Sequence, residues 1–388
     1  MALVEPHESS ATESRYFLDL GGFPEGASIK SKHFSTDWLQ LHPEGGFLIL
    51  DMRQRLMQFD DNGVYYGEIR MEQGGIVCFA YLRGEEKFVT IAGVREIDEV
   101  AYKIFLYDRE LQPIGTAEYH GNGKLVVPNF TRQILPIEDS RASPGNRFRI
   151  FINRWQPGFE NLHFPKMLQE VKLKQVGPRE WVFLDKGEPF DMQMEESAAF
   201  ASQFKQRWVV RDPESDLLLT MDQLRPVVEG YRPGRNGFKR EAAVPVHLER
   251  WVPRGSFFYE NSERAWFEKQ RKDGKDLDRN AYYRFWDASF SKVTGLYPYG
   301  TGYLVSYQRP NDISNGAISP DAGPHLLCLQ RLDRDRKPIG PSIERPGAFM
   351  FGVADDVAYL FHPSGSEKEP HRVEAVFGYH FPEKVKNL

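Results

Sequence analysis

The stretch TDWLQLHPEGGFLILDMRQRLMQFDDNGVYYGEIRM, residues 36–71, is the part of the chain that decides the fold. Two tight turns divide it, Pro43-Glu44-Gly45-Gly46 and Asp60-Asp61-Asn62-Gly63. Around these turns lie four short runs with strand character, at residues 37–42, 47–50, 56–59 and 64–69. Strands of this length joined by such short turns predict a four-stranded, up-and-down antiparallel sheet.

This sheet is too small to be stable alone, because both of its faces are apolar and need covers. Radial repetition of the same unit covers both faces at once. The signature of a turn followed by a closing strand recurs as Asp60 to Gly67, Asp108 to Gly115 and Asp333 to Gly340. The first two copies lie about 48 residues apart, the length of one propeller blade. We therefore predict an all-β protein, a β-propeller of about six blades, with seven as the alternative.

The two ends of the chain complement each other. Residues 349–353, 357–361 and 373–380 predict three strands of a last blade, and residues 16–20 form an orphan strand before the first blade. Closing the ring with this N-terminal strand would remove a free sheet edge. We expect a polar tail over residues 1–15 and a single propeller domain over residues 16–388.

Insertions are expected near residues 192–206 and 225–280. Short helices are predicted over residues 262–272, where Ser262 is a plausible N-cap, and over residues 195–206. Residues 225–243 are rich in Gly, Pro and Arg, which favours a long loop.

Residues 46–63 resemble an NHL-type repeat. That family's pattern is a strand ending in Asp, a polar turn with Arg, an apolar run, and then Phe-Asp-x-x-Gly. Here Asp51, Arg55, Phe59, Asp60 and Gly63 occupy the matching positions. The resemblance implies a six-bladed propeller and says more about fold than about activity. Asp51 and Arg55 are interpreted as structural residues that fix a turn through side-chain hydrogen bonds.

Composition narrows the class of partner. The net charge of −5 gives no reason to expect nucleic acid as a ligand. No run of about 18 apolar residues predicts a membrane span, and residues 1–16 contain no apolar core of a signal peptide. These features favour a cytoplasmic monomer, or an extracytoplasmic protein if the N-terminus was processed. Cys78 and Cys328 lie in apolar runs and are predicted to be buried free thiols.

Motifs of common enzyme classes are missing from the sequence. There is no Gly-x-Ser-x-Gly elbow, no phosphate-binding glycine loop and no His-Glu-x-x-His pair. Residues 276–287 superficially match a calcium loop, but Ala281 stands where the loop needs Gly. No cofactor is predicted, and an axial calcium ion in the propeller channel is the alternative.

An aromatic segment near the C-terminal third suggests a ligand site. Amphipathic rings beside Arg and Asp are typical of peptide and sugar clefts. The candidate ligand-binding residues are Tyr282, Arg284, Trp286, Asp287, Tyr299 and Tyr303. The other interpretation is that these rings pack between neighbouring blades.

The sequence therefore favours a non-catalytic binding or interaction module that uses one face of a propeller. Its ligand would be a peptide, a protein or a saccharide. The alternative is a metal-dependent hydrolase or lyase with an axial cation.

Overall fold

The computed structural model describes most of residues 16–378. The longer segments outside the described residues are 1–15, 30–37, 122–133, 139–147, 153–168, 188–206, 254–267, 275–289, 311–324 and 379–388. Shorter gaps of one to four residues lie between them.

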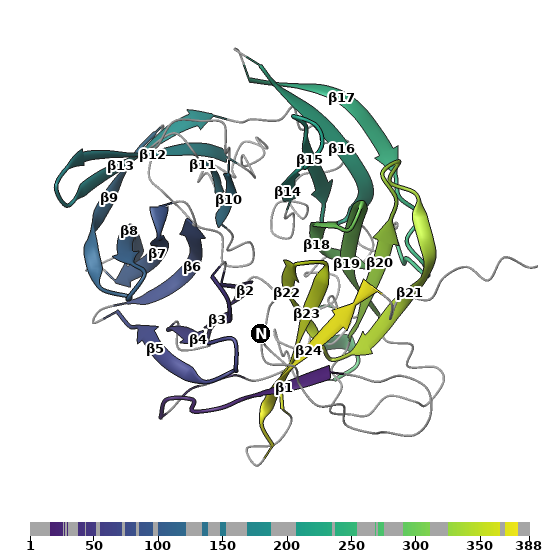
Figure 1. The fold of residues 1–388 in the computed structure, drawn as a ribbon, viewed down its shortest axis with the longest axis horizontal. Coiled ribbons are helices and arrows are strands. Elements are labelled where there is room, and N and C mark those ends of the chain that lie inside the picture. Colours follow the sequence, from purple (N-terminus) through teal and green to yellow (C-terminus); the bar gives the residue numbers. More distant parts are fainter. Residues whose placement is uncertain are drawn as a thin grey trace, which may run out of the picture.

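The described residues form six four-stranded antiparallel units arranged in a ring (Figure 1). The predicted all-β propeller is confirmed. Blade 1 consists of β2 (Leu39–Leu41), β3 (Phe47–Leu50), β4 (Leu56–Phe59) and β5 (Tyr65–Ile69). Its four strands correspond to the four predicted within residues 36–71, and the described residues of both predicted turns lie between strands.

The strands of blades 2 to 5 follow in chain order. Blade 2 has β6 (Gly75–Leu82), β7 (Lys87–Arg95), β8 (Val100–Asp108) and β9 (Pro113–His120). Blade 3 has β10 (Ile134–Glu138), β11 (Phe148–Ile152), β12 (Gln169–Gly177) and β13 (Glu180–Gly187). Blade 4 has β14 (Arg207–Arg211), β15 (Leu218–Asp222), β16 (Arg225–Gly234) and β17 (Gly237–Pro245). Blade 5 has β18 (Lys292–Tyr299), β19 (Gly302–Pro310), β20 (His325–Leu332) and β21 (Pro338–Pro346).

Blade 6 closes the ring with strands from both ends of the chain. It contains β22 (Phe349–Ala354), β23 (Val357–His362) and β24 (His371–Phe377), and β1 (Tyr16–Leu20) pairs antiparallel with β24. The chain then reaches blade 1, where the Gly21 N–H donates to the Gly63 carbonyl and the Tyr65 N–H donates to the Gly21 carbonyl. The predicted closure by an N-terminal strand is confirmed.

Blades 2 and 3 are also joined at the rim. Their outermost strands, β9 and β13, pair in parallel, so the two blades form one eight-stranded sheet (Figure 1). Gly115 permits this approach, since a Cβ there would lie 2.2 Å from the Arg179 carbonyl oxygen.

The apolar core lies between the blades. Residues on facing sheets form one cluster between blades 6 and 1, around Phe47 and Phe351, and another between blades 4 and 5, around Trp208 and Tyr303. Cys78 and Cys328 are buried thiols that form no disulfide, as predicted.

The up-and-down order of the strands gives the ring two unlike faces. The turns between the first and second strands of a blade, and between its third and fourth, emerge on one face, here called the short-turn face. None of these connections exceeds the nine residues between β10 and β11. The strand ends on the opposite face are the ones joined by the longer connections, which are residues 21–38, 121–133, 153–168, 188–206, 246–291 and 311–324.

The loop predicted over residues 225–243 is wrong, because these residues form β16 and most of β17. Their charged side chains pair with one another across the hairpin. Arg232 binds Glu241 at 2.6 Å, and Arg240 binds the buried Glu229 at 2.6 Å. The composition of this segment does not indicate a hairpin, because the ion-pair partners of its arginines are known only once the two strands are aligned.

The helix predicted over residues 195–206 lies outside the described residues. Within residues 262–272, the described residues are Glu268, Arg271 and Lys272, and all three are helical. In the part of the chain that the structure describes, no helix has the length and apolar character needed to cross a bilayer.

Candidate functional site

Four of the six ligand-binding candidates, Tyr282, Arg284, Trp286 and Asp287, lie outside the described residues. They belong to the connection between β17 and β18, and their proposed contact with ligand stays a prediction. The calcium-like segment 276–287 also lies outside the described residues. Elsewhere in the described chain, no group of three or more His, Cys, Asp or Glu side chains is placed to hold a metal ion.

The other two candidates, Tyr299 and Tyr303, flank the β18–β19 turn and are each 5% exposed. Tyr299 packs toward blade 6, whereas Tyr303 packs toward blade 4 and donates a hydrogen bond to Asp212. Burial, with smaller contributions from nearby charges, raises the pKa of each phenol to about 12. Both rings thus fill space between blades, and they lie on opposite sides of blade 5.

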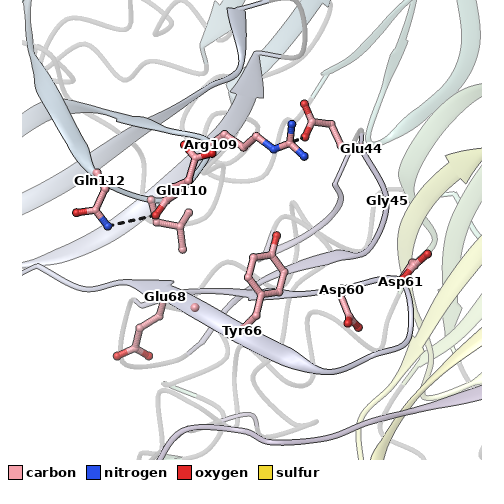
Figure 2. A pocket seen from close by; sticks show the side chains of 11 residues that line it. Glu44, Gly45, Asp60, Asp61, Tyr66, Glu68, Arg109, Glu110 and Gln112 are labelled. Atoms are coloured by element: carbon pink, nitrogen blue, oxygen red, sulfur yellow. Dashed lines mark hydrogen bonds and ion pairs between the residues drawn. The ribbon is translucent and has the colours of Figure 1, made fainter.

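A pocket of about 750 Å³ lies on the short-turn face between blades 1 and 2. Three turns and one strand build it (Figure 2). The β2–β3 turn contributes Glu44 and Gly45, the β4–β5 turn contributes Asp60 and Asp61, strand β5 contributes Tyr66, Gly67 and Glu68, and the β8–β9 turn contributes Arg109, Glu110, Leu111 and Gln112.

Two of these turns have the same internal structure. The Asp60 carboxylate accepts hydrogen bonds from the N–H groups of Asn62 and Val64, and Gly63 takes the left-handed conformation with φ 77°. In the β8–β9 turn, Asp108 accepts from the Gln112 N–H at 2.7 Å, and Leu111 is left-handed with φ 63°. The side-chain acceptors fix both turns, so the pocket has a rigid rim.

Gly67 lets the two blades meet at the pocket. A Cβ at this position would lie 3.0 Å from the Leu111 Cδ1 atom, tighter than an ordinary contact. The Leu111 side chain of blade 2 therefore packs directly against the backbone of the outer strand of blade 1.

Charge in the pocket is mostly negative, with five carboxylates against one guanidinium. Glu44 connects blade 1 to blade 2. Its carboxylate binds the Arg109 Nε at 2.9 Å and accepts a hydrogen bond from the Tyr81 hydroxyl at 3.0 Å. Glu68 lies 3.4 Å from Arg55. The charge of Arg109 is thus already matched by Glu44, and the net field in the pocket favours a cation.

Tyr66 is the aromatic residue of the pocket and is 55% exposed. Figure 2 shows its ring pointing from β5 toward the Glu44–Arg109 pair, with Asp60 and Asp61 to one side. Partial burial raises the pKa of this phenol to about 12, an effect that Arg109 opposes and that Glu44 and Asp60 increase. The phenol is therefore neutral at physiological pH and presents an uncharged ring face.

Tyr66, Glu44 and Arg109 are not among the ligand-binding residues predicted from the sequence. The adjacent residues Tyr65 and Tyr66 in a predicted strand are the one indication of this site in the sequence. Successive side chains of a strand point to opposite faces, so the two rings cannot both pack against the same neighbouring blade. Tyr65 packs between blades 6 and 1, and Tyr66 faces the pocket.

Other charged side chains are engaged inside the blades. Arg207 holds Asp222 through two hydrogen bonds of 2.7 and 3.1 Å, and Arg345 holds the buried Glu374 at 2.8 Å. His362 also contacts Glu374 at 2.8 Å, and these partners lower the pKa of that carboxyl although burial alone would raise it. These groups stabilise the sheets.

No family model matches the sequence, and no curated protein matches it either. Among solved structures, the chain is similar to a glucose dehydrogenase at 13% identity, with a TM-score of 0.40 over 87% of this chain and 94% of that one. It is similar to BBS1N in complex with ARL6DN at 8% identity, with a TM-score of 0.37 over 92% and 96% of the two chains. A luciferin-regenerating enzyme matches at 10% identity, with a TM-score of 0.37 over 92% and 96%. These names carry no information about the activity of this chain.

Proposed function

We propose that this β-propeller is a non-catalytic interaction module that binds a peptide segment bearing lysine or arginine in the pocket between blades 1 and 2. The observation that carries the proposal is the exposed ring of Tyr66 inside a pocket rimmed by carboxylates. A cation over an aromatic face is attracted by the ring quadrupole. Asp60, Asp61 and Glu110 add attraction of the same sign around that ring.

A positively charged peptide fits this pocket better than a saccharide does. Aromatic rings support both kinds of ligand, and carboxylates also accept hydrogen bonds from sugar hydroxyls. Only a cationic ligand gains in addition from the excess of negative charge in the pocket. The volume of about 750 Å³ lies within the range of small-ligand sites and accommodates a long side chain with part of its backbone. The rigid turns at the rim lower the cost of ordering the site on binding.

Binding should be tested with a peptide array and a glycan array, followed by titration calorimetry of the hits. The peptide series would place Lys, Arg, Gln or Glu at a central position in otherwise identical peptides. We expect binding of the Lys and Arg peptides, weakening with salt because the attraction is partly electrostatic. Selective binding of neutral glycans, or of Glu peptides over Lys peptides, would refute the proposal.

Tyr66→Ala should weaken peptide binding by roughly 2- to 30-fold, which corresponds to about 0.5–2 kcal/mol for a cation–π contact. Tyr66→Phe keeps the ring and should bind like the wild type. Val176→Ala is the matched control, because Val176 is also 55% exposed but lies on β12, away from the pocket. Equal affinity of the wild type and Tyr66→Ala would place the ligand elsewhere.

A further inference from the structure

His42, which directly follows β2, is a buried histidine behind the pocket wall. Its ring packs on Tyr81 and Phe88, with centroids 4.6 and 5.8 Å apart. Its Nδ1 atom accepts the N–H of Glu44 at 3.2 Å. An accepting Nδ1 places the ring proton on Nε2, which is buried and has no hydrogen-bond partner among the described residues.

The titratable and charged groups facing His42 come from three elements. Glu44 lies on its own turn, Tyr81 comes from β6, and Arg109 comes from the β8–β9 turn. Phe88 from β7 does not titrate. Burial lowers the pKa of His42 below its ordinary value, and Arg109 lowers it further against the opposing effect of Glu44. At neutral pH the imidazole is therefore uncharged and able to accept the Glu44 N–H.

Protonation removes this acceptor. An imidazolium carries hydrogen on both nitrogens, so Nδ1 would face the Glu44 N–H as a second donor. The buried charge would also have no acceptor at Nε2, which is a costly arrangement. Displacement of the Glu44 N–H from the ring relieves the contact between two donors, and Glu44 is the residue whose carboxylate binds Arg109 and Tyr81.

We propose that His42 is a pH-operated latch: neutral, it holds the β2–β3 turn and the Glu44–Arg109 bridge that completes the peptide pocket, and protonated, it releases both. This inference rests on the proposed function, since it concerns the regulation of the same pocket. The direction follows from linkage, because the released form binds one more proton than the latched form. The latch is therefore fully held above about pH 6.5, the ordinary value for His, and weakens as the pH falls toward the lowered pKa.

Hydrogen–deuterium exchange of the wild type at pH 7.5 and 5.5 tests the latch without any ligand, with labelling times scaled for intrinsic exchange. We expect the protection factors of the backbone amides in residues 42–46 to be lower at pH 5.5 than at pH 7.5. Because the released form binds one additional proton, the decrease is at most about tenfold per pH unit. The turn at residues 333–337 contains no histidine and serves as the internal reference.

Two variants give the comparison its specificity. His42→Asn keeps a side-chain acceptor for the Glu44 N–H and does not titrate, so its protection at residues 42–46 should be the same at both pH values. His371→Asn is the matched control, because His371 is a partly buried histidine whose Nδ1 also accepts a backbone N–H, from Ser364 at 2.9 Å in blade 6. It should leave the response of residues 42–46 unchanged. Unchanged wild-type protection at pH 5.5, or an equal loss in His42→Asn, would overturn the latch.

Binding of the Lys peptide then separates the latch from the proposed function. If the latch controls the pocket, wild-type affinity falls between pH 7.5 and 5.5 and the affinity of His42→Asn does not. A peptide that binds with the same pH profile to both proteins overturns the latch and leaves the proposed function intact. If no peptide binds at any pH, the proposed function fails, and the exchange experiment still decides whether His42 holds the turn.

Discussion

Asp51 and Arg55 illustrate how single residues hold this fold. Arg55 contacts Asp51 through its Nε at 3.1 Å and its Nη2 at 2.8 Å, and its N–H binds the other carboxylate oxygen at 3.0 Å. Both side chains are buried, with exposed fractions of 6% and 0%. The structural role predicted for this pair is confirmed, because each charge is matched inside the turn between β3 and β4.

Removing one member of this pair should be costly. Asp51→Ala leaves the Arg55 charge buried with less compensation, and we expect a loss of about 3–5 kcal/mol in the free energy of unfolding. The control is Arg372→Ala, which breaks an exposed pair with Asp19 at 2.9 Å and should cost less than about 1 kcal/mol. Urea denaturation measures both. Similar losses in the two variants would contradict a special role for the buried pair.

The hairpin between the third and fourth strands is the element that repeats most faithfully. In blades 1, 2 and 5 an Asp side chain caps the turn, and the fourth turn residue is left-handed, with φ of 77° at Gly63, 63° at Leu111 and 66° at Arg336. The three turns that begin at Asp60, Asp108 and Asp333 therefore share one backbone geometry, as their common sequence pattern predicts. Gly63 has a further constraint, since a Cβ there would lie 2.7 Å from the Asp19 carbonyl oxygen of β1.

Gly63→Ala should consequently destabilise the protein by more than left-handed strain alone. That strain is about 1–2 kcal/mol for an L-residue. Gly300→Ala isolates it, because Gly300 is also left-handed, with φ 56°, but has no atom within 4 Å of an added Cβ. Chemical denaturation should show a larger loss for Gly63→Ala. Equal losses would mean that β1 moves away from the new methyl group at little cost.

The local sequence pattern predicts the strands of the blades but not the pocket between blades 1 and 2. Strands and turns of blade 1 depend on residues adjacent in sequence, so residues 36–71 contained all the information needed. The pocket depends on the contact of Glu44 with Arg109, which are brought together only when two blades pack. The β16–β17 hairpin was not predicted for a similar reason, since the pairing of Arg240 with Glu229 requires the two strands to be aligned.

At the scale of the whole molecule, β1 is the strand on which the ring depends. It pairs with β24 over five residue pairs, from Tyr16 with Ala375 to Leu20 with His371. Leu18 and Leu20 also contribute to the apolar cluster between blades 6 and 1. Without β1, blade 6 would have three strands and an unpaired edge.

Deleting residues 1–20 should therefore lower the melting temperature by several degrees, because a loss of a few kcal/mol shifts a domain of this size by roughly 1–2 °C for each kcal/mol. Deletion of residues 1–15 leaves β1 in place and is the control. Differential scanning calorimetry would compare the two truncated proteins with the full chain. Identical melting of the shorter truncation and the longer one would show that closure by β1 contributes little.

The pairing of β1 with β24 has a consequence for how the protein is made. During translation β1 leaves the ribosome before the other strands of the ring and β24 leaves after them, so the ring stays open until residue 377 has emerged. Blades 1 to 5 can form from consecutive segments as they emerge, whereas the sixth must wait for both ends. A chain that is terminated before residue 371 lacks the partner of β1 and presents unpaired strands, the kind of surface that chaperones and proteases recognise. A closed ring and an interrupted one therefore differ in the strand edges that they expose.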